Sequence, residues 1–349
     1  MADLDASQMM RSVVCDSTRR SRGIDMKTIV QTVTLTIAMA GPAALAPTAS
    51  AQISKEFNNS KIVLQEYKKG DGGYWAYALG DPDDPDKSKR EIHPMDPKRA
   101  KVRTDMMKRR VLEEYAEFMS PFRLPRTLRA IASDCRGRKW DSPYYSPYYR
   151  WMNICYSYVA STETMADDVV KDPSKVKRWI PTTRGQLIAG EFAATVLHET
   201  GHALFDILGV PVFGREEDAA DQMEAFLALQ FGSDIARTII KADAYYYEWS
   251  ATVQKSDPTT FAEFSDVHGT DSQRVYNLLC MAYGGQRAAF QDMVDSGWLP
   301  PERAKNCESE YRRAEIAFRK TIVPFIDQAQ MKKVQARQGW FQPAELKEK

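Results

Sequence analysis

Residues 198–202 read His-Glu-Thr-Gly-His and lie within the stretch 186–208 (QLIAGEFAATVLHETGHALFDIL). This stretch lacks proline, repeats apolar residues at helical spacing and is followed by Gly209, so it predicts one long helix. Residues four apart lie on the same face of a helix, which lets His198 and His202 reach a single metal ion. We therefore expect the fold to form around a metal-binding helix.

Glu199 is placed to act on the water that completes the coordination of such an ion. A catalytic Zn2+ has three protein ligands and one open position, where it lowers the pKa of a water to about 7. A carboxylate beside that water can remove its proton as the water attacks a carbonyl carbon. The H-E-x-x-H pattern predicts one Zn2+ per chain, bound by His198 and His202, with Glu199 as the catalytic base.

The third ligand is expected in the acidic run that begins at Glu217 (EDAAD, residues 217–221). We predict that Glu217 binds the metal and that Asp221, one helical turn further, accepts the second ring N–H of a ligand histidine. An alternative is that these acidic residues only favour the positive end of a helix dipole. Glu216 or Asp218 could also replace Glu217 as the ligand.

The N-terminal region has the build of an export signal. From Met26 the chain has one lysine, an apolar stretch to about Leu45, and Ala49-Ser50-Ala51 as a cleavage site. We predict that residues 1–51 are a leader whose signal peptide starts at Met26, and that the mature protein is periplasmic or secreted. The apolar stretch is short and contains Pro42, so a membrane span is the weaker interpretation.

Four cysteines follow the leader, which fits an exported protein with two disulfides. Four cysteines permit three pairings, and we favour the sequence-local one, Cys135–Cys155 with Cys280–Cys307. The chain has no C-x-x-C spacing, so we do not expect a metal site built from thiolates.

The balanced charge of the chain gives no indication of a nucleic-acid partner. The 48 Lys and Arg residues balance 47 Asp and Glu residues, which gives a formal net charge of +1. A peptide or protein substrate is the expected partner, and the composition does not indicate an oligomeric state.

The patterning predicts an α+β fold with a small sheet packed on the metal-binding helix and a mostly helical second half. The expected elements are strands at 61–67, 129–132 and 151–160, and helices at 103–119, 186–208, 218–231, 273–283 and 301–322.

H-E-x-x-H followed by the E-x-x-A-D of residues 217–221 is similar to the arrangement in gluzincins, such as thermolysin and the CAAX-prenyl-protease type of peptidase. More closely, residues 198–222 (HETGHALFDILGVPVFGREEDAADQ) resemble a bacterial family of metallopeptidase-like proteins of unknown function. The resemblance covers about 112–325 and implies a zincin-like fold. By analogy with zincins, a peptide could add to the sheet along an edge strand near residues 152–159. Further matches are Cys135, the YSP of 145–147, Cys155-Tyr156 and the QRVYNLLCMAYG of 273–284.

The resemblance has departures and one additional implication. Thr200 stands where the family usually has leucine, and Ser157 where an acidic residue is commoner. By likeness to the CAAX-prenyl-protease type, His268, six residues before Arg274, would donate a hydrogen bond to the oxyanion. Alternatively, His268 is a surface-loop residue beside a helix-capping Asp266, and Arg274 is a structural partner of the acidic helix.

These observations divide the chain into a leader (1–51), a polar extension (52–102), a metallopeptidase domain (103–325) and a charged tail (326–349). The expected activity is zinc-dependent hydrolysis of peptide bonds through Glu-assisted attack of the zinc-bound water. One alternative is a non-catalytic exported protein whose fold is stabilised by zinc and which binds a partner. Another is a metallohydrolase of other amides or esters, because the chemistry at the carbonyl is shared.

Overall fold

The computed structural model describes residues 61–64, 97–133, 135, 142–176, 181–258 and 260–337. The predicted leader with its signal peptide lies outside these ranges, as does most of the predicted polar extension. In chain order the main elements are β1 (Ile62–Leu64), α2 (Pro97–Lys108), α3 (Val111–Met119), β2 (Leu128–Ser133), β3 (Tyr144–Ser146), β4 (Trp151–Cys155), α4 (Tyr156–Lys171), α5 (Arg184–Leu208), α6 (Glu216–Ala228), α7 (Ser233–Trp249), α8 (Asp271–Gly285), α9 (Arg287–Asp295), α10 (Pro301–Thr321) and α11 (Gln328–Ala336).

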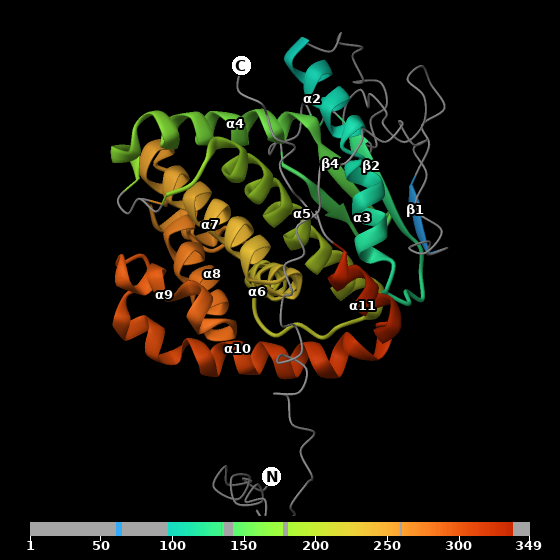
Figure 1. The fold of residues 1–349 in the computed structure, drawn as a ribbon. Coiled ribbons are helices and arrows are strands. Elements are labelled where there is room, and N and C mark those ends of the chain that lie inside the picture. The colour runs from blue at the N-terminus through green and yellow to red at the C-terminus, as the bar shows by residue number, and fades with distance from the viewer. Residues whose placement is uncertain are drawn as a thin grey trace, which may run out of the picture. The chain divides into compact units, whose positions relative to one another are not determined.

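The described strands form one mixed sheet in the order β1-β2-β4-β3 (Figure 1). β1, β2 and β4 are parallel, and β3 is antiparallel to β4. The predicted peptide-binding edge near residues 152–159 is therefore wrong, because β4 lies between β2 and β3. Within the described residues, the sheet edge next to the predicted metal-binding helix is β3, which contacts α5.

The strand predicted for 151–160 ends at Cys155, and α4 begins at the next residue. Tyr158, Thr162, Met165 and Val169 are buried along α4, at the three- and four-residue spacing of a helix face. The aromatic start of this segment resembles a strand, and the helical pattern becomes visible only over a longer window. The α+β class is confirmed, as is the mostly helical second half.

α5 is the helix predicted to bind the metal, and the sequence specifies both of its ends. Thr183 and Gln186 form a capping box at the N-terminus. Gly209 ends the helix with a φ of 66°, a left-handed conformation that costs glycine little. α5 packs against α4, α6, α7 and β3, so it lies at the centre of the packed elements. In Figure 1, α4 lies along the top and α10 along the bottom, with α5 to α8 between them.

The helix predicted for 103–119 is two helices, α2 and α3. Arg110 separates them in a left-handed conformation with a φ of 57°. A non-glycine residue in that conformation has no clear sequence signal, which explains why the break was not predicted.

The segment predicted as a charged tail contains the packed helix α11. The backbone N–H of Asp327 donates to the carbonyl of Pro121 at 2.8 Å, and Val334 is buried. Arg337 also forms an ion pair with Glu117. The packed structure thus includes α11, and the segment just before it lies against the segment that follows α3.

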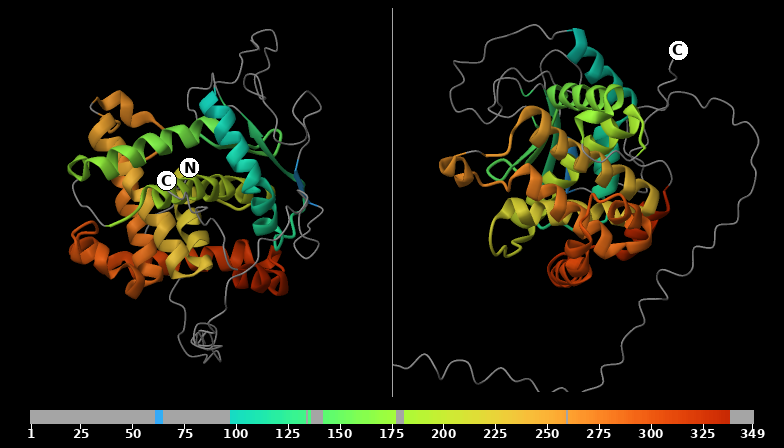
Figure 2. Two further views of the ribbon diagram at one scale, coloured as in Figure 1. Left: turned by 45° about the horizontal axis from the view of Figure 1, so that its top comes forward. Right: turned by 90° about the vertical axis from the view of Figure 1, so that its left-hand side faces the viewer.

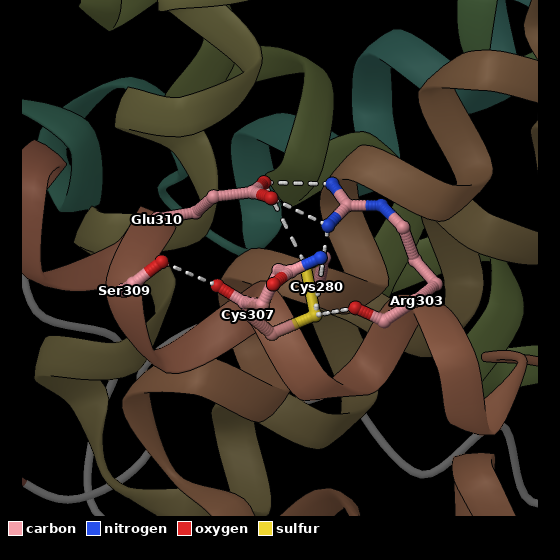
Figure 3. Close-up of a disulfide and its surroundings, with 6 residues drawn as sticks. Cys280, Arg303, Cys307, Ser309 and Glu310 are labelled. Carbon is pink, nitrogen blue, oxygen red and sulfur yellow. Dashed lines mark hydrogen bonds and ion pairs between the residues drawn. A yellow bond between two sulfur atoms is a disulfide. The ribbon is translucent and has the colours of Figure 1, made fainter.

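Both predicted disulfides are present. Cys135–Cys155 links the segment after β2 to the end of β4, and Cys280–Cys307 links α8 to α10. Arg303 makes a bidentate pair with Glu310 beside the second disulfide, with N–O distances of 2.6 and 2.7 Å (Figure 3). Two disulfides indicate that the chain folds in an oxidising compartment. Among the described helices, none is long and apolar enough to cross a membrane.

We expect the double variant Cys280→Ala/Cys307→Ala to unfold more easily than the wild type. The disulfide closes a loop of 27 residues, for which loop entropy predicts a loss of about 3.5 kcal/mol in the free energy of unfolding. Denaturant titration measures this change, and Ser309→Ala on the same helix serves as the control. A loss below about 1 kcal/mol would show that the crosslink does not hold α8 against α10.

Candidate metal centre

His198 and His202 of α5 meet Glu217 of α6 in a compact triangle of ligand atoms. The Nε2 atom of His198 lies 3.1 Å from Oε2 of Glu217, and the Nε2 atom of His202 lies 3.3 Å from the same oxygen. The two Nε2 atoms are 3.2 Å apart. The structure thus brings together all three residues predicted as metal ligands.

These distances fit a divalent metal ion. Ligand bonds of 2.0–2.1 Å in tetrahedral geometry place neighbouring donor atoms about 3.3 Å apart. All three sides of the triangle are close to that value. Two imidazoles and one carboxylate are also the donor set of catalytic zinc sites, which leave a fourth position open.

Small residues at the crossing of α5 and α6 allow this approach. A Cβ atom on Gly201 would lie 3.2 Å from the Cα of Ala220 and 3.2 Å from the Cβ of Met223, which is tighter than ordinary contact. Glu217 stands in the first turn of α6, where a negative side chain is stabilised by the helix dipole. The first turn of α6 therefore lies directly against the histidine face of α5.

Asp221 connects His198 to a buried arginine. Its Oδ1 lies 2.8 Å from Nδ1 of His198, and its two oxygens accept hydrogen bonds from Arg274 at 2.6 and 2.9 Å. The guanidinium of Arg274 lies 4.3 Å from the centre of the Tyr247 ring. Burial opposes the charge on Asp221, but Arg274 and His198 outweigh it and hold the pKa of Asp221 below its usual range. Asp221 and His198 thus lie next to each other, as their predicted roles require.

Glu199 follows His198 and faces the sheet edge. Its Oε2 accepts a hydrogen bond of 2.8 Å from the backbone N–H of Tyr145 in β3. Burial raises the pKa of Glu199, which makes the carboxylate a stronger base, although the neighbouring histidines and the Tyr145 N–H oppose the shift.

The charges of the ligand residues stabilise one another. Burial alone would raise the pKa of Glu217, but hydrogen bonds with His198, His202 and His268 hold it well below its usual range. Burial alone would lower the pKa of His198, but Asp221 and Glu217 raise it to about 10. Burial would also lower the pKa of His202, but its contact with Glu217 raises it. The Nδ1 atom of His202 lies 2.7 Å from Oε1 of Glu216, which raises this pKa further. The site thus attracts positive charge.

His268 lies at the rim of the triangle. Its Nε2 is 3.1 Å from Oε2 of Glu217, and its Nδ1 is 2.8 Å from Oδ1 of Asp266. The following helix, α8, is capped by Thr270 rather than by Asp266. The histidine predicted to lie near the reaction centre is therefore beside a predicted metal ligand, and its side chain remains 41% exposed.

Three buried carboxyl groups behind Asp221 were not predicted. Glu191, Glu224 and Asp243 come from α5, α6 and α7, and each is at most 2% exposed. Burial raises the pKa of all three, and that of Asp243 to about 7. Each is an acidic residue within an apolar helical stretch, and this pattern indicates a buried carboxyl group. The pattern does not indicate which of these side chains face one another.

The described residues contain two groups whose ligand atoms all lie within 4.8 Å of one another: His198, His202 and Glu217, and His198, Asp221 and Glu224. The first has the geometry of a metal site. In the second group, Asp221 is already paired with Arg274. Asp221 therefore contacts His198 and orients its ring instead of binding a second metal ion.

Comparison with known proteins places this donor set in context. The chain matches the model of a family described as "Putative metallopeptidase" over residues 92–321, well over half of its length. It belongs to that family, and membership suggests a peptidase role and a bound metal ion. No curated protein and no solved structure matches the chain.

We expect Gly201→Val to disturb the crossing of α5 and α6. The added methyl groups would push Ala220 away, lower the free energy of unfolding by about 1–3 kcal/mol and weaken metal binding by separating Glu217 from the histidines. Denaturant unfolding and zinc titration measure the two effects. Gly269→Ala is the control, because a Cβ there meets nothing closer than 3.5 Å. Wild-type zinc affinity in Gly201→Val would contradict this account of how Glu217 is positioned.

Proposed function

We propose that this protein is a zinc-dependent metallopeptidase that hydrolyses peptide bonds. The observation that carries the proposal is the triangle of His198, His202 and Glu217 with Glu199 adjacent to it. In this proposal the three residues hold one Zn2+, and Asp221 orients His198 through its Nδ1 atom. The H-E-x-x-H and E-x-x-A-D pair supports a gluzincin-like arrangement.

The bound ion would supply a Lewis acid that polarises a carbonyl and lowers the pKa of a water to about 7. Glu199 would take a proton from the attacking water and return it to the leaving nitrogen. Because Oε2 of Glu199 accepts the Tyr145 N–H, we expect Oε1 to carry the proton. Tyr145 would hold the carboxylate in one orientation during both transfers.

The outer edge of β3 is the proposed place for the substrate backbone. Tyr145 is paired with Met152 of β4, yet its N–H donates to Glu199, so this N–H points away from the sheet. A peptide that adds to this edge would lie beside the Glu199 carboxylate. This replaces the interior strand β4 as the expected binding edge.

We propose that His268 donates a hydrogen bond to the oxyanion formed at the carbonyl carbon. Its Nε2 lies next to Glu217, and Asp266 contacts its Nδ1, which favours a proton on the ring. The pKa of His268 is raised by its contact with Glu217, despite partial burial. A positively charged donor at this point would favour a developing negative charge.

We propose that the protein acts in the periplasm or is secreted. The two disulfides support an oxidising compartment, and the signal-peptide pattern in residues 26–51 supports export.

Glu199→Gln should retain one zinc per chain and lower peptide hydrolysis by about 10²- to 10⁴-fold, because the amide cannot accept a proton. Metal analysis and a peptide-library digest, each with and without a chelator, measure these effects. Glu302→Gln, which changes an exposed acidic residue in the first turn of α10, is the matched control. A wild-type rate in Glu199→Gln, or a purified chain without metal, contradicts the proposal.

His268→Ala should keep zinc and lower kcat by about 10²- to 10³-fold, with little change in KM. His268→Gln, which keeps an N–H donor, should recover part of the rate. Loss of zinc in His268→Ala would instead mean that this residue mainly holds Glu217 in place, and unchanged kcat would exclude a role in the reaction.

A further inference from the structure

Two loops meet beside the metal centre, and both end at residues of the site. Loop 209–215 joins α5 to α6 and leads to Glu217, and loop 255–270 leads to His268 and α8. Nη1 of Arg215 donates to the backbone carbonyl of His268 at 3.1 Å, which connects the loops directly. In the right-hand view of Figure 2 they project from the same side of the folded unit.

The first loop holds a phenylalanine in solvent. Val210 and Val212 pack against the core, whereas Phe213, the next residue, is 97% exposed. Gly209 and Gly214 take positive φ angles on either side, which fixes the course of the loop. The two partly buried valines therefore anchor the loop, while Phe213 faces solvent.

The second loop exposes three more apolar side chains. Phe261 is 95% exposed, Phe264 59% and Val267 62%. Residues 261–265 form a 3₁₀ turn, in which side chains three apart lie one above the other, so Phe261 and Phe264 share a face.

This second loop is fastened at its base. Ser256 hydrogen-bonds Asp271, and Ser272 hydrogen-bonds Asp257 through both its side chain and its backbone N–H. The apolar side chains are thus presented by a loop with defined ends. Phe213, Phe261, Phe264 and Val267 are together called the apolar rim.

The charges around the rim disfavour a membrane surface as its partner. Glu216, Asp218 and Asp266 are negative, against Arg215 and, when protonated, His268. This acidic balance repels the anionic headgroups that attract peripheral proteins to membranes. Exposed apolar side chains within a polar border are instead typical of a protein-binding surface.

We propose that the apolar rim binds apolar side chains of an extended polypeptide, so that the substrates are hydrophobic segments of unfolded proteins. The inference rests on the proposed peptidase function, because the two loops that carry the rim lead to Glu217 and His268 of the proposed catalytic centre. A backbone along the outer edge of β3 would place alternate side chains on either side of the strand, and the rim would bind the apolar side chains on the side that faces its loops. Folded proteins keep such segments buried, whereas unfolded chains expose them.

The test uses two fluorescent twelve-residue peptides of equal charge. One carries Leu, Val and Phe at alternate positions, and the other carries Ser, Thr and Gln there. Binding to the mature Glu199→Gln chain with added zinc is followed by anisotropy. We expect the apolar peptide to bind at least tenfold more tightly, and Phe213→Ser/Phe264→Ser to abolish the difference.

Ile316→Ser is the matched control, since Ile316 is an exposed apolar residue of α10. It should keep the preference for the apolar peptide. Equal binding of both peptides, or a preference that survives loss of Phe213 and Phe264, overturns the inference. Binding to phosphatidylcholine or phosphatidylglycerol vesicles that depends on the rim, without a preference between the peptides, also overturns the inference. A dimer of this chain that dissociates in the Phe213→Ser/Phe264→Ser variant overturns it as well.

Hydrolysis by the wild-type chain separates this inference from the proposed function. Cleavage of both peptides with equal kcat/KM overturns the rim as a specificity surface while the peptidase function stands. Rim-dependent binding of the apolar peptide without any cleavage supports the binding surface and overturns the peptidase function.

Discussion

The close crossing of α5 and α6 is the constraint on which the candidate metal centre depends. His198 and His202 are placed on one face by the geometry of a single helix, but Glu217 reaches them only because Gly201 and Ala220 leave room for backbone contact. The third donor is thus set by packing, whereas the first two are set by helical periodicity. A small change in the separation of the two helices acts on the metal donors before it acts on the rest of the fold.

Electrostatic support for the centre comes from the helices behind it. Arg274 of α8 compensates the buried charge of Asp221, while burial favours the neutral form of Glu191, Glu224 and Asp243. A charged group in the interior is tolerable when it is paired, and Asp221 is paired on both sides. The orientation of His198 therefore depends on α8 as well as on α5 and α6.

Local patterns predicted α5, its end at Gly209 and the shared face of His198 and His202, because each depends on residues close together in the sequence. The sequence also indicated Glu217 and the sequence-local disulfide pairing, although packing decides both. Local patterns failed where distant residues decide the outcome. Nothing local to Cys155 shows that β4 ends there, and nothing local to Arg110 shows a left-handed break. The position of β4 inside the sheet and the packing of α11 follow from contacts between distant segments. The hydrogen bond from Tyr145 to Glu199, 54 residues apart, had no sequence signal.

The groups around the centre come from widely separated parts of the chain, from Tyr145 in β3 to Arg274 in α8. A polypeptide emerging N-terminus first contains both histidines long before Arg274 is available to pair with Asp221. An incomplete chain would hold the H-E-x-x-H helix without its full supporting shell. The order of synthesis therefore delays assembly of the complete centre until the second half of the molecule has folded.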